Sequence, residues 1–330
     1  MIELYQFPFS HYCEKVRWAL DYKGIAYQTV NLLPGFHVRY LAKLAPKTCV
    51  PVLRDGAIVV QDSSAIIDYL DRRYANPTLT PSDPNAAREA LDWEEYFDEQ
   101  IGANLRLWFY YHTLPERRLA LSFLLQGAAW HKKPAFLLVY PKVRQRMLQS
   151  MNINTDTARQ AEERLRVALE KLDEALVGRR FLVDDRFSRA DLTACALLKR
   201  SCIPNEASKK IPPAVRKLRE ELKSRRLCQW VRSVYACYRQ PPPARVSPNQ
   251  YEATNAAPSY SSGGAVGGFS GLDFFREAFF ALARLDLATA FFALKLVAVR
   301  LAALPRTDLE DLRALSRTVD FLFRSTRFLR

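Results

Sequence analysis

The chain has 330 residues, which is enough for two domains and an extension, and its formal net charge at pH 7 is +14. Its basic residues are concentrated in 101–150 and 201–240 and are not interleaved with an RNP, zinc-finger or helix-turn-helix signature, so we expect no specific nucleic-acid recognition. Six cysteines without a CxxC pair and four histidines without metal-ligand spacing argue against a metal site. The first residues lack the basic and apolar regions of a secretory signal, and we expect a cytoplasmic protein.

The first 75 residues predict a compact α/β domain. Alternating β-prone residues, helical periodicities and turn residues follow one another in the order β-α-β-α-β-β-α. The expected strands are 2–7, 26–32, 50–53 and 57–60, and the expected helices are 13–23, 38–44 and 63–74. The domain is placed at residues 1–78.

The character of the chain changes after Pro77 and Pro81. Residues 84–240 contain long helical patterns and no convincing strand, and they predict an all-helical domain. The clearest pattern runs from 155 to 177, where apolar residues recur at three- and four-residue spacing. A second helix start is predicted at Ser188, where Asp191 completes a capping box with it, and Phe187 and Leu192 stand where a hydrophobic staple would close.

The last 90 residues have a different composition. Residues 241–271 are rich in Pro, Gly and Ser and are interpreted as a flexible linker. Residues 272–330 predict a helical extension of unknown role. Its apolar stretches are interrupted by charges too often for a transmembrane helix.

Three short segments carry candidate chemistry. Ser10 and Cys13 stand at the start of the first helix, where free N–H groups and the helix dipole favour a thiolate. Val50-Pro51 opens a strand, and a cis bond there would leave the Val50 backbone free to pair with an extended ligand. At the start of the third helix, Asp62 and Ser63 offer an anion and a carboxylate-binding N–H.

Each segment also has an ordinary structural interpretation. A serine at a helix start is more often a cap, a proline at a strand start is usually architecture, and Cys13 is more often a small buried hydrophobe. Together, on this βαβαββα order, the three segments describe a pocket for a short thiol peptide with a carboxylate and an ammonium at one end.

With these three segments in this order, the sequence resembles the glutathione S-transferase superfamily. Residues 1–75 are similar to its N-terminal domain through Phe9–Arg17, Val50-Pro51 and the Asp62–Leu70 stretch, and residues 85–240 are similar to its helical domain. The resemblance implies a thioredoxin-like N-terminal domain, an all-α C-terminal domain and a homodimer. It indicates a serine-type active site and a bacterial-type class that the sequence does not assign further. The C-terminal extension is unusual for the superfamily.

The resemblance also implies roles for the candidate residues. Ser10 matches the serine that activates the glutathione thiolate, and Cys13 occupies the fourth position of the same tetrad. Val50 would pair with the cysteinyl backbone of glutathione, Asp62 and Ser63 would hold its γ-glutamyl end, and His37 would reach its glycyl carboxylate. The expected reaction is attack of the thiolate on a small apolar electrophile, with glutathione as co-substrate and no metal.

A second hypothesis stays open. Members of this superfamily also serve as interaction domains, and the C-terminal helices would then bind a partner or a membrane surface. Loss of turnover on removal of the Ser10 hydroxyl would count against this alternative.

Overall fold

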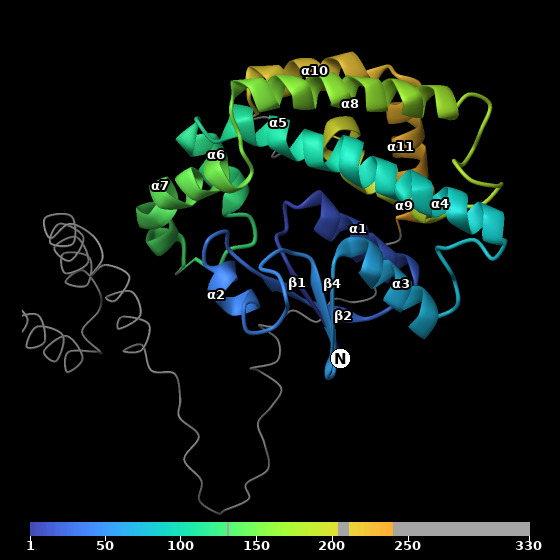
Figure 1. Cartoon of the computed structure of the whole chain (residues 1–330), viewed down its shortest axis with the longest axis horizontal. Helices are drawn as coiled ribbons and strands as arrows, with labels where there is room; N and C mark the ends of the chain where they lie inside the picture. The colour runs from blue at the N-terminus through green and yellow to red at the C-terminus, as the bar shows by residue number, and fades with distance from the viewer. Residues whose placement is uncertain (131, 204–210, 240–330) are drawn as a thin grey trace, which may run out of the picture. The chain divides into compact units, whose positions relative to one another are not determined.

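The computed structural model describes residues 1–130, 132–203 and 211–239, which belong to one structural unit. Figure 1 shows an N-terminal part built around a sheet, with a layer of helices on one side of it. The linker expected at 241–271 and the extension expected at 272–330 lie outside the described residues.

Four strands form one mixed sheet in the order β2-β1-β3-β4. β1 pairs in parallel with β2 and antiparallel with β3, and β3 and β4 form an antiparallel hairpin. The elements of this part are β1 (Ile2–Gln6), α1 (His11–Tyr22), β2 (Tyr27–Asn31), α2 (His37–Leu41), β3 (Val52–Asp55), β4 (Ile58–Gln61) and α3 (Ser63–Arg73). The predicted order of strands and helices is confirmed, and this part of the fold is thioredoxin-like.

The two faces of the sheet bury different side chains because successive residues of a strand point to opposite sides. Leu4 of β1 belongs to the main core, together with Val16 of α1 and Ile66 of α3. Its neighbour Tyr5 packs instead with Leu41 of α2 in a small separate cluster. The sheet is therefore covered by α1 and α3 on one face and by α2 on the other.

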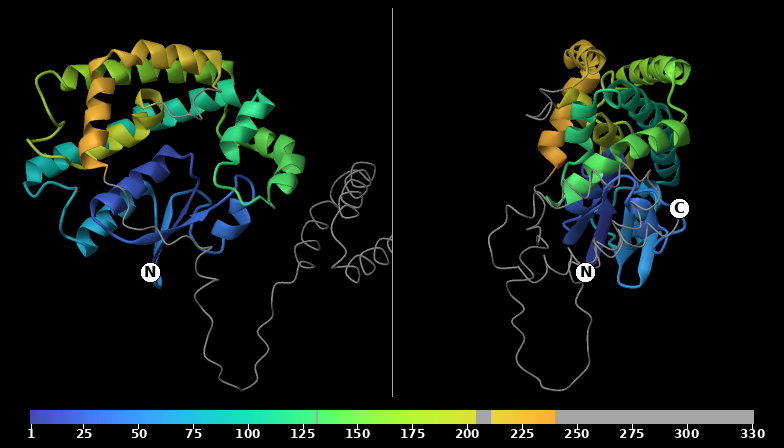
Figure 2. Two further views of the ribbon diagram at one scale, coloured as in Figure 1. Left: turned by 180° about the vertical axis from the view of Figure 1, so that it is seen from behind. Right: turned by 90° about the vertical axis from the view of Figure 1, so that its left-hand side faces the viewer.

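The rest of the described chain is helical, as predicted. Its elements are α4 (Pro84–Tyr96), the π-helix η1 (Phe97–Ala103), α5 (Asn104–Thr113), α6 (Arg117–Leu124), α7 (Lys132–Ser150), α8 (Thr155–Ala175), α9 (Arg189–Cys202), α10 (Pro213–Lys223) and α11 (Arg226–Tyr238). Helix α9 lies at the centre, in contact with α1, α4, η1, α10 and α11, and α11 crosses the direction of α10 (Figure 2). Among the described residues, no helix is both long and apolar enough to cross a membrane.

The central helix α9 begins at the capping box that the sequence predicts. The Ser188 N–H donates to the Asp191 carboxylate at 2.9 Å, and both residues are fully buried. Asp191 also accepts a hydrogen bond from the Leu182 N–H at 2.8 Å. The carboxylate therefore fixes the start of α9 and ties the preceding loop to it.

A disulfide that the sequence spacing does not predict joins the other end of α9 to α11. Cys202 is the last residue of α9, and its sulfur is bonded to that of Cys228 across a separation of 26 residues. Cys13, Cys49, Cys195 and Cys237 are free.

Candidate functional site

A cavity of about 520 Å³ lies between the N-terminal part and the helices. One wall is formed by residues around the start of α1, the start of α2 and the loop before β3. The opposite wall is formed by side chains of α5, α6, α7, α9 and α10. Aromatic rings from both parts line it, among them Phe9, Trp108, Phe109, Tyr110 and Phe123.

Ser10 caps α1 and faces this cavity. Its Oγ accepts a hydrogen bond from the Cys13 N–H at 3.3 Å, in the usual geometry of an N-cap. The oxygen accepts in this contact, and the Ser10 side chain also hydrogen-bonds to the Cys13 thiol, which opposes the effect of burial on the pKa of that thiol. The hydroxyl proton can be donated to a ligand atom in the cavity if it leaves this contact. The capping role and the predicted donor role are therefore compatible in one side chain.

Cys13 is placed differently from the sequence hypothesis that names it with Ser10 as a catalytic residue. Its side chain is fully buried, it does not line the cavity, and burial raises the pKa of its thiol. A buried thiol with a raised pKa is neither accessible nor ionised at neutral pH. The placement favours the ordinary interpretation of Cys13 as a small core residue.

The two residues between them have other tasks. Burial raises the pKa of Tyr12, and its hydroxyl donates to the Asp98 carbonyl at 2.8 Å. Burial, together with Arg106, Arg200 and Lys15, lowers the pKa of His11 to about 3, so its imidazole is neutral at physiological pH.

The π-helix η1 brings the Asp98 carbonyl to Tyr12 by a very close backbone approach. A Cβ at Gly102 would lie 2.5 Å from the Tyr12 hydroxyl oxygen, so only glycine fits there. With the Tyr12 hydroxyl engaged, Ser10 is the hydroxyl best placed to meet an anion at this helix start.

His37 begins α2 and lines the same cavity. Its Nδ1 is buried without a hydrogen-bond partner among the described residues, and its ring meets the Phe7 ring edge-on at 4.9 Å. Burial lowers its pKa despite the nearby backbone carbonyls of Leu33 and Thr48. His37 therefore contributes a neutral imidazole to the cavity lining, with its Nδ1 turned away from solvent.

The predicted cis bond between Val50 and Pro51 is confirmed. Val50 lines the cavity, and Pro51 is buried behind it. Gln61, which the sequence analysis does not single out, fixes the loop before Val50. Its side chain donates to the carbonyls of Lys47 and Cys49 at 2.6 and 2.8 Å and accepts from the Lys47 N–H at 2.9 Å.

Asp62 and Ser63 stand at the start of α3, outside the cavity lining. Asp62 Oδ1 accepts from the N–H groups of Ser64 and Ala65 at 2.9 and 3.2 Å, and its side chain is exposed. Since Val52 pairs with Gln61, continuing the register by one residue places Asp62 across from Pro51. The second carboxylate oxygen and the first N–H groups of α3 thus lie next to the Val50-Pro51 segment.

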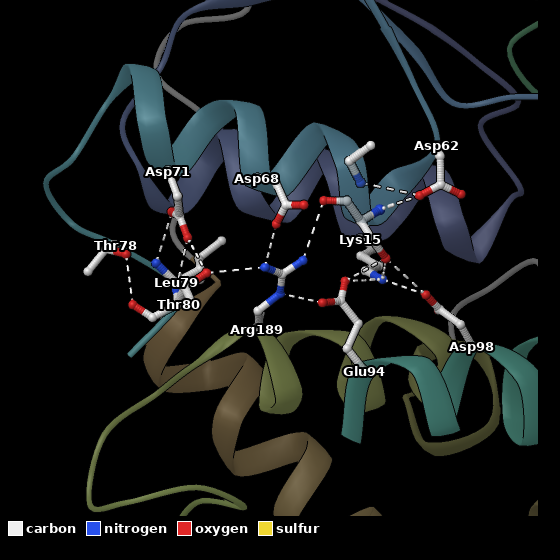
Figure 3. Close-up of polar contacts among 12 residues, drawn as sticks. Lys15, Asp62, Asp68, Asp71, Thr78, Leu79, Thr80, Glu94, Asp98 and Arg189 are labelled. Carbon is white, nitrogen blue, oxygen red and sulfur yellow. Dashed lines mark hydrogen bonds and ion pairs between the residues drawn. The ribbon is translucent and has the colours of Figure 1, made fainter. Parts of the chain in front are cut away.

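Behind this helix start, a buried polar network joins the two parts of the protein (Figure 3). The Lys15 ammonium, wholly inaccessible to solvent, lies 2.5 Å from Glu94 and 2.7 Å from Asp98 and donates to Ser64 Oγ at 3.1 Å. Arg189 bridges Glu94 and Asp68. The network connects α1 and α3 to α4, η1 and α9, so it fixes the position of the α3 start against the helices.

The arrangement as a whole suits a thiol peptide. A helix N-terminus with a hydroxyl donor stabilises a thiolate, and an extended backbone beside Val50 would lead to the Asp62 carboxylate and the polar groups of Ser63. Ser10, His37 and Val50 share one cavity, whereas Asp62 and Ser63 are separate from it and Cys13 lies in the core. In the part of the chain that the structure describes, no three His, Cys, Asp or Glu side chains gather as a metal site would need.

Comparisons with known proteins point to one family. Residues 4–78 match the family model described as glutathione S-transferase, N-terminal domain, and residues 134–226 match that described as glutathione S-transferase, C-terminal domain. The two matches cover 75 and 93 residues, which together are just over half of the 330 residues of the chain.

Individual relatives are similar over parts of their length. Glutathione S-transferase 1 of Dianthus caryophyllus is 32% identical over 39% of this chain and 66% of its own length. Glutathione S-transferase TCHQD of Arabidopsis thaliana is 27% identical over 60% of this chain and 76% of its own length. Glutathione S-transferase Z2 of the same plant is 44% identical, over 25% of this chain and 38% of its own length. Among solved structures, a β-etherase from Sphingobium sp. strain SYK-6 matches 70% of this chain and 98% of its own with 19% identity and a TM-score of 0.49.

Proposed function

Because this chain belongs to the glutathione S-transferase superfamily, we propose that it binds glutathione, ionises its thiol and transfers the thiolate to an electrophile held in the cavity. The observation that carries the proposal is the placement of Ser10. Its Oγ accepts from the start of α1, its hydroxyl is a hydrogen-bond donor, and it lines a cavity that also has aromatic walls. We also propose that the protein acts as a homodimer in the cytoplasm, as the family resemblance and the sequence imply.

In this mechanism glutathione lies extended along the Val50 segment. The Ser10 hydroxyl donates a hydrogen bond to the sulfur, and the positive end of the α1 dipole further favours the thiolate over the thiol. The thiol proton passes to solvent. Ser63, through its N–H and hydroxyl, and the Asp62 carboxylate hold the carboxylate and ammonium of the γ-glutamyl end, and His37 donates to the glycyl carboxylate.

The electrophile occupies the half of the cavity lined by the helices. Phe109 and Phe123 are in contact there, with ring centroids 4.8 Å apart, and offer an apolar surface for a planar group. The cavity brings this surface and Ser10 to one space, so the enzyme would gain rate by placing the sulfur and the electrophilic atom side by side.

The test is glutathione binding by calorimetry, with thiolate absorbance recorded against pH for wild type, Ser10→Ala and Cys13→Ala. We expect wild type to bind glutathione and to lower its thiol pKa. Ser10→Ala is expected to lose that shift and to reduce kcat by roughly a hundredfold, the typical effect of removing one donor to a developing or stabilised anion. Cys13→Ala removes the buried thiol that hydrogen-bonds to Ser10 and tests whether that group takes part.

Two results would contradict the proposal. Loss of the thiol shift in Cys13→Ala alone would transfer the chemistry to a cysteine-based mechanism. Absence of glutathione binding in all three proteins would leave the fold as a non-catalytic interaction module.

A further inference from the structure

The cavity is lined by four arginines and by no acidic side chain among the described residues. Arg106 comes from α5, Arg146 from α7, Arg200 from α9 and Arg219 from α10. All four belong to the helical part, and Arg106 lies 5.6 Å from the centre of the Tyr12 ring, close to the start of α1. The half of the cavity assigned above to the electrophile is therefore both aromatic and strongly cationic.

Arg106 and Arg146 are exposed, whereas Arg200 and Arg219 are partly buried. Arg200 and Arg219 differ from other buried arginines of the protein in having no anionic partner among the described residues. Arg17 is paired with Glu14, Arg189 with Glu94 and Asp68, and Arg239 with Glu14 and Asp21. That pairing is the normal state of a buried guanidinium, because an unpaired buried charge is costly. An uncompensated group in a cavity wall is a candidate for contact with a ligand.

Arg219 shows the lack of an anionic partner most clearly. Its Nε is buried and has no hydrogen-bond partner within the described chain. Burial lowers its pKa, which means that desolvation of the guanidinium is not offset by a nearby carboxylate.

Arg200 is partnered only by neutral groups. It donates to the Gln126 side-chain oxygen at 3.3 Å and lies 5.1 Å over the Phe123 ring. Its pKa is lowered by burial and by Arg17 and Arg219, against the opposing effect of Glu14. Glu14 is already held by Arg17, Lys199 and Arg239, so it does not neutralise Arg200.

The Arg200 guanidinium lies directly beside the aromatic wall of the cavity. Phe123, which lies under Arg200, also contacts Phe9 at 4.5 Å between ring centroids and Phe109 at 4.8 Å. A ligand that fills this space would meet ring faces on one part and guanidinium groups on another. Guanidinium groups bind carboxylates with paired, charge-assisted hydrogen bonds.

We propose that the electrophile of this enzyme is an aromatic carboxylate, with its ring against Phe109 and Phe123 and its carboxylate held by Arg200 and Arg219. This inference rests on the proposed function and names the substrate class of the same cavity. It modifies the expectation of a purely apolar electrophile, because a neutral arene would leave the guanidinium groups desolvated without an anion.

The reaction is testable with two arenes that differ in charge, 4-chloro-3,5-dinitrobenzoate and 4-chloro-3,5-dinitrobenzamide. In both, the glutathione thiolate supplies the electron pair for a new carbon–sulfur bond at the chlorine-bearing carbon, and the nitro groups carry the negative charge of the adduct. The carbon–chlorine bond then breaks and chloride leaves with its electron pair. Rates are divided by the uncatalysed rate of each arene, since the substituent alters its intrinsic reactivity.

We expect wild type to show a KM for the benzoate about tenfold or more below that for the benzamide. Arg219→Gln should raise the KM for the benzoate about ten- to a hundredfold, the range for losing a charge-assisted hydrogen bond, and leave the benzamide unaffected. Arg219→Lys should retain part of the preference. Arg216→Gln is the matched control, because Arg216 lies on the same helix, is exposed and does not line the cavity.

Binding of the unreactive 3,5-dinitrobenzoate and 3,5-dinitrobenzamide, measured by calorimetry without glutathione, separates the two proposals. Arg219-dependent preference for the benzoate supports the inference even if no electrophile is turned over, in which case the transferase proposal alone fails. Equal binding of both arenes overturns the inference and leaves the transferase proposal to its own test. Loss of glutathione affinity in Arg219→Gln, with unchanged arene binding, also overturns it, since the arginine would then serve the tripeptide.

Discussion

Three neighbouring residues at the start of α1 show how burial decides function at the scale of single residues. Ser10 faces the cavity, Tyr12 donates its hydroxyl to a backbone carbonyl, and Cys13 is in the core. The sequence motif contains all of these groups and cannot rank them, because helical periodicity does not say which side a capping residue presents. Accessibility and hydrogen-bond partners separate the donor from its neighbours.

Glu14, the next residue along α1, leads to a prediction about how the stability of the fold depends on pH. Burial alone would raise its pKa, but Arg17, Lys199 and Arg239 outweigh this effect and lower it to about 2. A carboxyl whose pKa is lower in the folded state contributes stability above about pH 4.5 and loses it as the pH falls toward 2. This contribution amounts to about 3 kcal/mol at neutral pH.

We therefore expect Glu14→Gln to lower the free energy of unfolding by about 3 kcal/mol at pH 7 and to converge with wild type as the pH approaches 2. Urea unfolding followed by circular dichroism at several pH values measures both effects. Glu170→Gln, a change at an exposed position of α8, is the control. A constant difference between Glu14→Gln and wild type at every pH would contradict the assignment.

At the scale of elements, the start of helix α9 is predicted from the sequence, whereas its contact with the preceding loop is not. Its capping box at Ser188 and Asp191 is a local pattern and is found as the sequence predicts. Burial raises the pKa of Asp191 to about 6, although the Leu182 and Ser188 N–H groups oppose this. The contact with Leu182 is not contained in the box motif, because it depends on how the preceding loop folds back.

The far end of α9 carries the Cys202–Cys228 disulfide, from which a second stability prediction follows. A cross-link that closes a loop of this length contributes about 3 kcal/mol by restricting the unfolded chain. Reduction with dithiothreitol should lower the wild-type free energy of unfolding by this amount and have no effect on a Cys202→Ala/Cys228→Ala double variant. Cys195→Ala, a buried free cysteine of the same helix, should keep the full response to the reductant. An identical response to reductant in the double variant would rule the disulfide out as its source.

At the scale of the whole described molecule, the Lys15–Glu94–Arg189 network joins the sheet-containing part to the helices (Figure 3). Burial would raise the pKa of Glu94, but Lys15 and Arg189 lower it overall, so the carboxylate is ionised at neutral pH. It is shared by two cations that solvent does not reach. The site depends on this junction, since one wall of the cavity comes from each part.

Glu94→Gln should therefore lower the free energy of unfolding by about 1.5–3 kcal/mol, because Lys15 and Arg189 lose their shared anion and keep only Asp98 and Asp68. It should also weaken glutathione binding, since Lys15 and Arg189 hold the Ser64 segment next to Asp62. Denaturant unfolding and calorimetry measure the two effects. Glu95→Gln, one position along α4 and exposed, should change neither. A stability loss below about 1 kcal/mol would show that the network is dispensable.

The sequence by itself determined what local interactions encode. The order of strands and helices, the cis Val50-Pro51 pair and the start of α9 follow from periodicity, turn residues and capping chemistry within a few positions of one another. Local motifs single out Ser10 and Val50, and the family resemblance adds His37. All three line one cavity, and their roles toward a ligand stay predictions.

Tertiary structure decided what depends on segments distant in the chain. It placed Cys13 in the core, paired Lys15 with Glu94, joined Cys202 to Cys228, and brought arginines of α5, α7, α9 and α10 to one cavity. The physical reason is that a charge or thiol acquires its chemistry from burial and from its partners. Both are set only when helices far apart in sequence pack together and remove these groups from water.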